Sequence, residues 1–183
     1  MTDFTTLTIR GQRSDDLEQL LALWSTPAIL LNSLELPYMS DDSFRDHFAN
    51  PPADMHTLIA EAGLASGRRR IIGMAWLNTT ARPRRRHVGS LGVIIYPDYA
   101  DSDAAAMLLE AVLELSDTWL GLRRLEVFVF ADDTAAMALY ERHGFEHEAT
   151  LRRYAFRQGT WADARLLARL HRPGAPLTQD ESA

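Results

Sequence analysis

The sequence predicts an α/β protein whose mixed central sheet has about seven strands and carries helices on both faces. Three observations lead to this prediction. Apolar runs with the length of strands alternate along the chain with longer segments whose apolar residues recur at helical spacing. The run His87–Tyr96 ends in residues that are apolar on both faces, as expected for a central strand. The helix beginning at Ala104 separates this run from the strand Leu125–Phe130, and a parallel pair of strands needs such a crossover connection.

The N-terminal part is expected to form one strand followed by one helix. Leu7–Gly11 has the composition of a strand, and Ser14 belongs to the residue types that cap helix N-termini. Apolar residues then recur at helical spacing on one face, namely Leu17, Leu20, Leu21 and Trp24. Pro27 is expected to end this helix, and no regular element is predicted in the apolar segment Ala28–Met39.

A second helix and a hairpin are expected next. The helix begins at Ser40 and stops at Asn50, because a residue that precedes a proline is disfavoured in the helical conformation. One side of this helix carries two aromatic residues, Phe44 and Phe48. His56–Gly63 and Ile71–Asn78 are predicted strands, and the sequence ASGRRR between them is the expected turn.

The C-terminal part is expected to alternate helices and strands. A long helix over Ala104–Leu120 carries one apolar stripe, formed by Leu108, Val112, Leu115 and Trp119. After the strand Leu125–Phe130, a helix over Thr134–His143 is closed by Gly144, a residue that suits a left-handed cap. Two last strands are predicted, over Glu146–Phe156 and Trp161–His171.

Length and composition place the chain among ordinary globular proteins. At 183 residues it has room for a single domain with a proper core, predicted over residues 1–171, and residues 172–183 are predicted to be a disordered tail. The net charge of −6 argues against bulk binding of nucleic acid. No apolar run approaches the roughly 20 residues that span a bilayer, and the start MTDFTTLTIR lacks signal-peptide features. We therefore expect a cytoplasmic protein with neither nucleic acid nor a membrane as partner.

Two residue types are missing, and each absence excludes a class of chemistry. Without cysteine there are no disulfides, thiolate nucleophiles or cysteine metal sites. Without lysine there is no amine nucleophile, Schiff base or phosphate-binding lysine, since arginine stays protonated. No metal site is predicted, because the helix-breaking Gly144 separates His143 from His147.

Arginine side chains gather in two groups, Arg68–Arg70 and Arg82–Arg86. Both groups fall in a predicted turn or loop and lack interleaved aromatic residues. A solvated surface is therefore the better interpretation than a nucleic-acid site. A bidentate contact of Arg84 or Arg86 with a substrate carboxylate is left open.

The most informative stretch connects the strand Leu91–Tyr96 to the helix that begins near Ala104. A strand that turns directly into a helix N-terminus usually makes a phosphate site, because free backbone N–H groups and the helix dipole point at the anion. This turn contains no glycine and three aspartates, Asp98, Asp101 and Asp103. Either a phosphate binds in spite of these carboxylates, or this helix start no longer binds phosphate.

A second motif indicates which phosphate compound to expect. Within ADDTAAMALYERHGF, residues 131–145, Asp133, Ala136, Tyr140 and Gly144-Phe145 follow in order. This pattern resembles the Asn-x-x-Ala-x-x-x-Tyr-x-x-x-Gly-Phe signature of the GNAT (Gcn5-related) acyl-CoA N-acetyltransferases. The resemblance extends over roughly residues 7–171. The segments LNSLELP, ARPRRRHVGSLGVII and YAFRQGTWADARLLARL are similar to the amino-acid N-acetyltransferase branch of that superfamily.

The resemblance implies that acetyl-CoA is the co-substrate and that its pyrophosphate lies at the acidic turn. The family motif Gln/Arg-x-x-Gly-x-Gly/Ala falls on Ala100, Asp101, Ser102, Asp103, Ala104 and Ala105. Ala100 lacks the long polar side chain, Asp103 replaces a glycine, and only the small residue Ala105 is kept. Two carboxylates here are expected to weaken CoA binding by roughly 10²-fold or more. The open alternative is a helix start that its own aspartates cap.

The resemblance also assigns roles on the helix Thr134–His143 and at its start. The phenol of Tyr140 is expected to protonate the departing CoA thiolate, although a core tyrosine with a satisfied hydroxyl is the alternative. Asp133 and Ala136 stand at cofactor-binding positions, with Asp133 in place of the usual asparagine. Asp133 would equally serve as a plain helix N-cap.

Further candidates come from a strand and from the segment after Pro27. The main chain of the central strand is expected to bind pantetheine and the acetyl carbonyl, through Val93, Ile94 and Ile95. In the family the segment after the first helix overhangs the acceptor site, which suggests substrate contacts from Asn32, Glu35 and Tyr38. The candidates for the general base are Glu61, Glu35, His87 and a bound water.

Two functions are compatible with these residues. The first is an N-acetyltransferase that moves acetyl from acetyl-CoA to a primary amine of a small molecule such as an amino acid. The second is a binding or regulatory protein, with a homodimer as one form, that keeps the fold and has lost normal CoA binding. The acidic turn favours the second function and Tyr140 the first, and fold alone does not decide between them.

Overall fold

A computed structural model describes residues 4–38 and 40–171, so the predicted tail at residues 172–183 lies outside the described residues. Its strands are β1 (Phe4–Gly11), β2 (Met55–Leu64), β3 (Arg69–Thr79), β4 (Val88–Ile95), β5 (Arg124–Phe130), β6 (Glu146–Arg157) and β7 (Thr160–Leu170). Its α-helices are α1 (Leu17–Trp24), α2 (Pro27–Leu31), α3 (Asp41–Ala49), α4 (Ala104–Glu114) and α5 (Thr134–Arg142). Short 3₁₀ turns occupy η1 (Ser14–Asp16), η2 (Pro83–Arg85) and η3 (Pro97–Tyr99), and η4 (Leu115–Trp119) is a π-helix.

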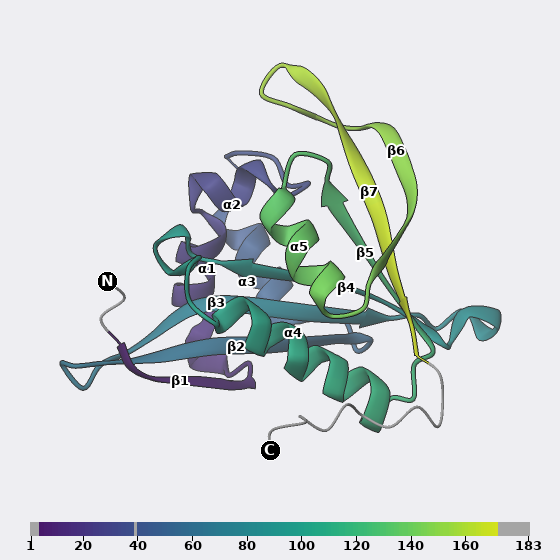
Figure 1. Cartoon of the computed structure of the whole chain (residues 1–183). Helices are drawn as coiled ribbons and strands as arrows, with labels where there is room; N and C mark the ends of the chain where they lie inside the picture. Colours follow the sequence, from purple (N-terminus) through teal and green to yellow (C-terminus); the bar gives the residue numbers. More distant parts are fainter. Residues whose placement is uncertain (1–3, 39, 172–183) are drawn as a thin grey trace.

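The strands form one seven-stranded sheet in the order β1-β2-β3-β4-β5-β7-β6 (Figure 1). Neighbouring strands are antiparallel except for β4 and β5, which are parallel and joined through α4. The predicted mixed sheet and its one helical crossover are thus confirmed. Within the described residues, no helix is both long and apolar enough to cross a membrane.

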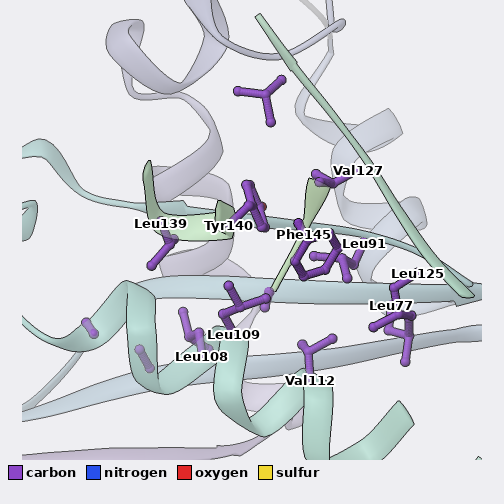
Figure 2. Close-up of a cluster of buried hydrophobic side chains, with 14 of the residues drawn as sticks. Leu77, Leu91, Leu108, Leu109, Val112, Leu125, Val127, Leu139, Tyr140 and Phe145 are labelled. Atoms are coloured by element: carbon purple, nitrogen blue, oxygen red, sulfur yellow. The ribbon is translucent and has the colours of Figure 1, made fainter. Parts of the chain in front are cut away.

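Helices cover both faces of the sheet, as predicted. Ile71 and Ile72 are adjacent on β3 and point to opposite faces, where each joins a different cluster of buried side chains. One cluster lies under α1 to α3 and includes Leu20, Leu23, Ile29, Phe48, Ile59 and Met74. The larger cluster lies under α4 and α5 (Figure 2) and includes Leu77, Leu91, Leu108, Leu109, Val112, Leu125, Val127, Leu139, Tyr140 and Phe145. The first turn of α4 and the body of α5 are therefore anchored by one common core.

The helix predicted over Ala104–Leu120 is only partly an α-helix. α4 ends at Glu114 and continues as the π-helix η4. A π turn holds more residues per turn, so it rotates the following side chains out of the α-helical stripe. Trp119, predicted on the apolar face, is 74% exposed, and Ser116 is buried instead. The prediction for Trp119 was therefore wrong, while Leu108 and Val112 are buried as expected.

A short helix that the sequence did not indicate lies between α1 and α3. α1 ends at Trp24, before Pro27, as predicted. Pro27 is then the first residue of α2, a position where its missing N–H costs nothing. Ile29 is buried against the α1–α3 side of the sheet. This burial positions the segment that leaves α2 at Asn32.

Candidate active site

The strands β4 and β5 pair over a short distance and then separate. Their parallel pairing covers only Val88–Ser90 of β4 and Arg124–Glu126 of β5. Beyond this point β4 stays with β3 up to Ile95, while β5 stays with β7 up to Phe130. The facing edges of β4 and β5 beyond Ser90 therefore have no strand partner, and their main-chain groups are available to a ligand.

A cavity of about 360 Å³, here called the reaction pocket, opens where the two strands separate. It brings together seven residues that the sequence marked as candidates, namely Asn32, Glu35, Val93, Ile94, Asp133, Ala136 and Tyr140. Five other lining residues are aromatic and were not predicted, namely Trp24, Trp76, Phe128, Phe130 and Tyr154. The pocket is therefore apolar in the main, with two carboxylates and one buried phenol.

Gly92 makes room for one of these aromatic side chains. It lies opposite Trp76 in the pairing of β3 with β4. A Cβ at position 92 would come within 2.2 Å of the Trp76 ring. Any larger residue there would displace the indole ring from the wall of the reaction pocket.

Tyr140 lies among the buried side chains of the core (Figure 2), and it also lines the reaction pocket from α5. Its side chain is almost fully buried and packs edge-to-face on Phe145, with ring centroids 5.4 Å apart. Burial raises the pKa of the Tyr140 phenol far above its ordinary value; the main chain of Val93 acts in the opposite direction, and the charge of Asp133 adds to the rise. The phenol therefore stays protonated at neutral pH and faces the free edge of β4 as a proton donor.

Asp133 is the N-cap of α5. Its Oδ1 accepts a hydrogen bond from the main-chain N–H of Ala136 at 3.0 Å. This contact uses an acceptor oxygen, which an aspartate offers as well as an asparagine does. The replacement of the family's asparagine therefore leaves the start of α5 closed by its own side chain.

The start of α4 has a different arrangement. Asp103 is the N-cap, but its side chain makes no capping hydrogen bond. Ser102 Oγ donates to the carbonyl of Tyr99 at 2.6 Å and accepts a long bond from the N–H of Ala104 at 3.4 Å. No described residue accepts a hydrogen bond from the N–H of Ala105, the next amide of the turn. The predicted pyrophosphate positions 100–105 thus keep free donors, outside the residues that line the reaction pocket.

The carboxylates of the acidic turn point into solvent. Asp98, Asp101 and Asp103 are all exposed. Solvent screens exposed charges more strongly than buried ones. Their repulsion of an anion at this helix start is therefore screened by solvent, and the weakening of CoA binding by these carboxylates stays a prediction.

The segment after α2 forms one wall of the reaction pocket. Asn32 Oδ1 accepts a hydrogen bond from Arg157 Nη1 at 2.9 Å, which ties the segment to β6. Ser33 Oγ accepts from the N–H of Glu35 at 3.1 Å and shapes the turn. Tyr38 does not reach the reaction pocket: it is fully exposed and lines an outer groove of about 870 Å³ instead.

Only one of the three side chains considered as a general base lines the reaction pocket, and it is Glu35. Glu61 belongs to an ion-pair cluster, since it accepts from Arg10 Nη2 at 2.7 Å and from Arg69 at 3.2 Å. The hydrogen bond from Arg10 holds the pKa of Glu61 below its ordinary value, against the effect of burial. His87 is exposed just before β4 and is not among the lining residues.

Other candidates lie elsewhere. Arg84 and Arg86 lie in and directly after η2, and neither lines the reaction pocket. Over residues 4–38 and 40–171, no three His, Asp or Glu side chains are grouped as a metal ion would need. Arg157, at the rim of the reaction pocket, was not predicted as a site residue. The sequence marked it only as part of the segment YAFRQG, which resembles the family.

Known proteins resemble this chain in sequence and in fold. The family model described as "Acetyltransferase (GNAT) family" matches residues 17–145. The chain is 29% identical to the L-amino acid N-acetyltransferase AaaT of Escherichia coli (strain K12) over 164 residues, which cover 90% of this chain and 98% of that protein.

Two solved structures illustrate the shared fold. An acetyltransferase of the GNAT family from Streptococcus pneumoniae has a TM-score of 0.75 at 25% identity, covering 91% of this chain and 100% of that one. A spermidine N-acetyltransferase from Vibrio cholerae in complex with CoA and spermine also has a TM-score of 0.75, at 24% identity, covering 90% of this chain and 95% of that one.

Proposed function

Since the chain belongs to the acetyltransferase (GNAT) family, we propose that it transfers the acetyl group of acetyl-CoA to the primary amine of a small molecule. An amino acid is the first acceptor to consider, because the Escherichia coli relative is an L-amino acid N-acetyltransferase. The observation that carries the proposal is the reaction pocket, where a free strand edge and a protonated phenol face the same space.

The proposed contacts with acetyl-CoA divide between two places. Free main-chain N–H groups at the start of α4, over positions 100–105, bind the pyrophosphate with help from the helix dipole. The unpaired edge of β4 at Val93, Ile94 and Ile95 binds the pantetheine arm and polarises the thioester carbonyl. Acetyl-CoA supplies the acyl group as a thioester, so no covalent enzyme intermediate is needed.

Two side chains are proposed to move protons. Glu35, directly or through a water molecule, takes a proton from the acceptor amine. Tyr140 gives its phenolic proton to the sulfur that leaves. The phenol carries this proton at neutral pH, and burial, which raises its pKa in the empty protein, does not itself favour the transfer.

The alternative function, a binding protein without catalysis, depends on the acidic turn. Its premises were that the aspartates repel the diphosphate, that they cap the helix N–H groups themselves, and that Ala100 lacks the family's long polar side chain. The side chain of Asp103 makes no capping bond, and no observation specifically favours this alternative.

Calorimetric titration with acetyl-CoA, combined with Tyr140→Phe, tests the proposal. We expect a dissociation constant in the micromolar range and, in the variant, a kcat lower by about 10²-fold with similar cofactor affinity. Tyr154→Phe is the matched control, because it removes a phenol from the other wall of the same pocket. A cofactor that fails to bind at millimolar concentration, or equal losses in both variants, would refute the proposal.

A further inference from the structure

Arg157 connects three parts of the molecule at the end of β6. Its Nη1 donates to Asn32 Oδ1 at 2.9 Å, and its Nη2 pairs with Asp132, which directly precedes the cap of α5. The guanidinium plane lies over the ring of Phe130, with Cζ 4.2 Å from the ring centroid. The side chain is 17% exposed, so an arginine far from both partners in sequence is held in one orientation.

This guanidinium lies at the junction of two cavities. The outer groove, which Arg157 lines, shares Ser33, Leu34 and Glu35 with the reaction pocket. Two contacts of Arg157, with Asn32 and Phe130, are with residues that line the reaction pocket itself. Among the described residues that line either cavity, Arg157 is the only basic one.

We propose that Arg157 binds the carboxylate of an amino-acid acceptor and so determines which amines are acetylated. The proposal rests on the proposed function and adds the place where the acceptor's anionic end is held. Among the described residues that line the reaction pocket, Glu35 and Asp133 are the only charged ones, and both repel a carboxylate. The anionic end of the acceptor is therefore directed to the rim, where the guanidinium is.

The hydrogen bonds of Arg157 leave one edge of its guanidinium group able to exchange its present partner for a ligand. Nε and Nη2 form the edge that holds a carboxylate side-on with two parallel hydrogen bonds. Asp132 uses Nη2 alone, and Nε has no partner among the described residues and is not one of the buried unpartnered atoms. Asp132 is 70% exposed, so an incoming carboxylate can replace it at little cost while Asn32 keeps Nη1 in place.

The remaining walls select the body of the acceptor. The outer groove is lined by apolar side chains that are exposed in the free protein, among them Leu34, Leu36 and Phe156. Aromatic rings line the reaction pocket beside them. An amino acid with an apolar or aromatic side chain buries these surfaces, which favours binding in proportion to the apolar area covered.

The test compares L-phenylalanine with its primary amide as acceptors, because the two differ only in the carboxylate. Wild-type protein is expected to have a kcat/KM at least tenfold higher for the free acid. Arg157→Gln is expected to remove this preference through KM, and Arg157→Lys to restore only part of it, since an ammonium is a point charge without the fork. Asp132→Asn is the matched control. It removes the carboxylate that pairs with Nη2 of Arg157, and it is expected to raise kcat/KM for the free acid about threefold.

A second measurement decides the outcome without turnover. 3-Phenylpropanoate has the carboxylate and no amine, so its binding to wild-type protein and to Arg157→Lys can be measured by calorimetry even if no amine is acetylated. Tenfold weaker binding of 3-phenylpropanoate to Arg157→Lys supports the proposed role of Arg157. If that result is obtained and no amine is acetylated, only the proposed acetyltransferase function is refuted. Equal affinities, a wild-type preference for the amide, or equal losses for acid and amide in Arg157→Gln would overturn the proposal.

Discussion

The helices α4 and α5 both begin with an aspartate at the N-cap, and only one of the two aspartates closes its helix. The side chain of Asp133 accepts from the N–H of Ala136, whereas the side chain of Asp103 accepts no hydrogen bond from its own helix. The backbone explains the difference. A capping side chain needs a non-helical N-cap backbone, and Asp133 has ψ 76°, while Asp103 has ψ 0° and is already turned toward the helix. The same residue type therefore completes one helix and leaves the donors of the other free for a ligand.

A third aspartate at a helix start extends this comparison. Asp16 precedes α1, is buried, and accepts from the N–H of Arg13 at 2.7 Å and from both terminal nitrogens of Arg10 at 2.7 Å. Glu61 shares the same arginine from β2. The carboxylate of Asp16 is buried and paired, that of Asp133 is half-buried and caps a helix, and that of Asp103 is exposed and makes no capping bond. Their contributions to stability are expected to fall in that order.

The largest effect is expected for Asp16→Ala. The variant leaves Arg10 partly buried with Glu61 as its remaining partner, and removing one member of a buried ion pair costs about 3 kcal/mol. Urea unfolding followed by circular dichroism measures the loss. Asp15→Ala, at an exposed neighbour, is the control and should change the free energy of unfolding by less than about 0.5 kcal/mol. Similar losses of unfolding free energy in the two variants would contradict the expectation that Asp16 contributes most to stability.

The same ion pairs predict a loss of stability in acid. Burial acts to raise the pKa of Asp16, but the hydrogen bonds from Arg10 and Arg13 outweigh it, so this pKa, like that of Glu61, is below its ordinary value. The stabilisation is present above the unfolded-state pKa of about 4 and is lost as the pH falls through the lower folded-state values. Urea midpoints should therefore drop more steeply below pH 5 for wild-type protein than for Asp16→Asn. Parallel pH profiles would show that these carboxylates do not carry the acid sensitivity.

A smaller effect is expected when the two caps are compared directly. Asp133→Ala removes a capping hydrogen bond and should lower the free energy of unfolding by about 1 kcal/mol. Asp103→Ala removes no such bond and should change it by less than about 0.5 kcal/mol. Thermal and urea unfolding of both variants check the contrast. A larger loss in Asp103→Ala than in Asp133→Ala would mean that the open start of α4 is closed in solution.

The smallest effect is expected on cofactor affinity. Asp103→Asn removes one exposed charge beside the proposed pyrophosphate site, and we expect acetyl-CoA to bind about threefold more tightly, with the gain decreasing at high salt. Asp42→Asn makes the same change in charge on α3, which covers the opposite face from α4, and serves as the control. Calorimetry at two salt concentrations measures both. An unchanged affinity in Asp103→Asn would place the diphosphate away from this carboxylate.

Much of the fold could be predicted because each prediction depended on neighbours in sequence. Strand and helix positions from β2 to β7 agree with the spacing of apolar residues, and the cap at Gly144 has the expected positive φ of 82°. The two failures, α2 and the π-helix after Glu114, have a common cause. Both depend on how a segment packs on the sheet, and apolar spacing alone does not distinguish a π turn from an α turn.

The candidate site divides in the same way. The motif at residues 131–145 identified Tyr140 and Asp133 by their spacing, and both line one pocket with Val93. Nothing in the sequence connects Arg157 with Asn32, because the two residues are 125 positions apart. The exposure of Asp101 and Asp103 also depends on the folded chain and cannot be read from residue types. The weakening of CoA binding by these carboxylates stays a prediction.

The sequence by itself determined the order of the elements, the mixed sheet and the family signature, since these depend on periodicities and residue types within short windows. Only the tertiary structure decided where β4 and β5 separate, which aspartate closes its helix and that Arg157 lies at the pocket rim. Each of these depends on a backbone angle or on a meeting of distant segments. Such features arise when the core packs as a whole, and no local window of residues contains them.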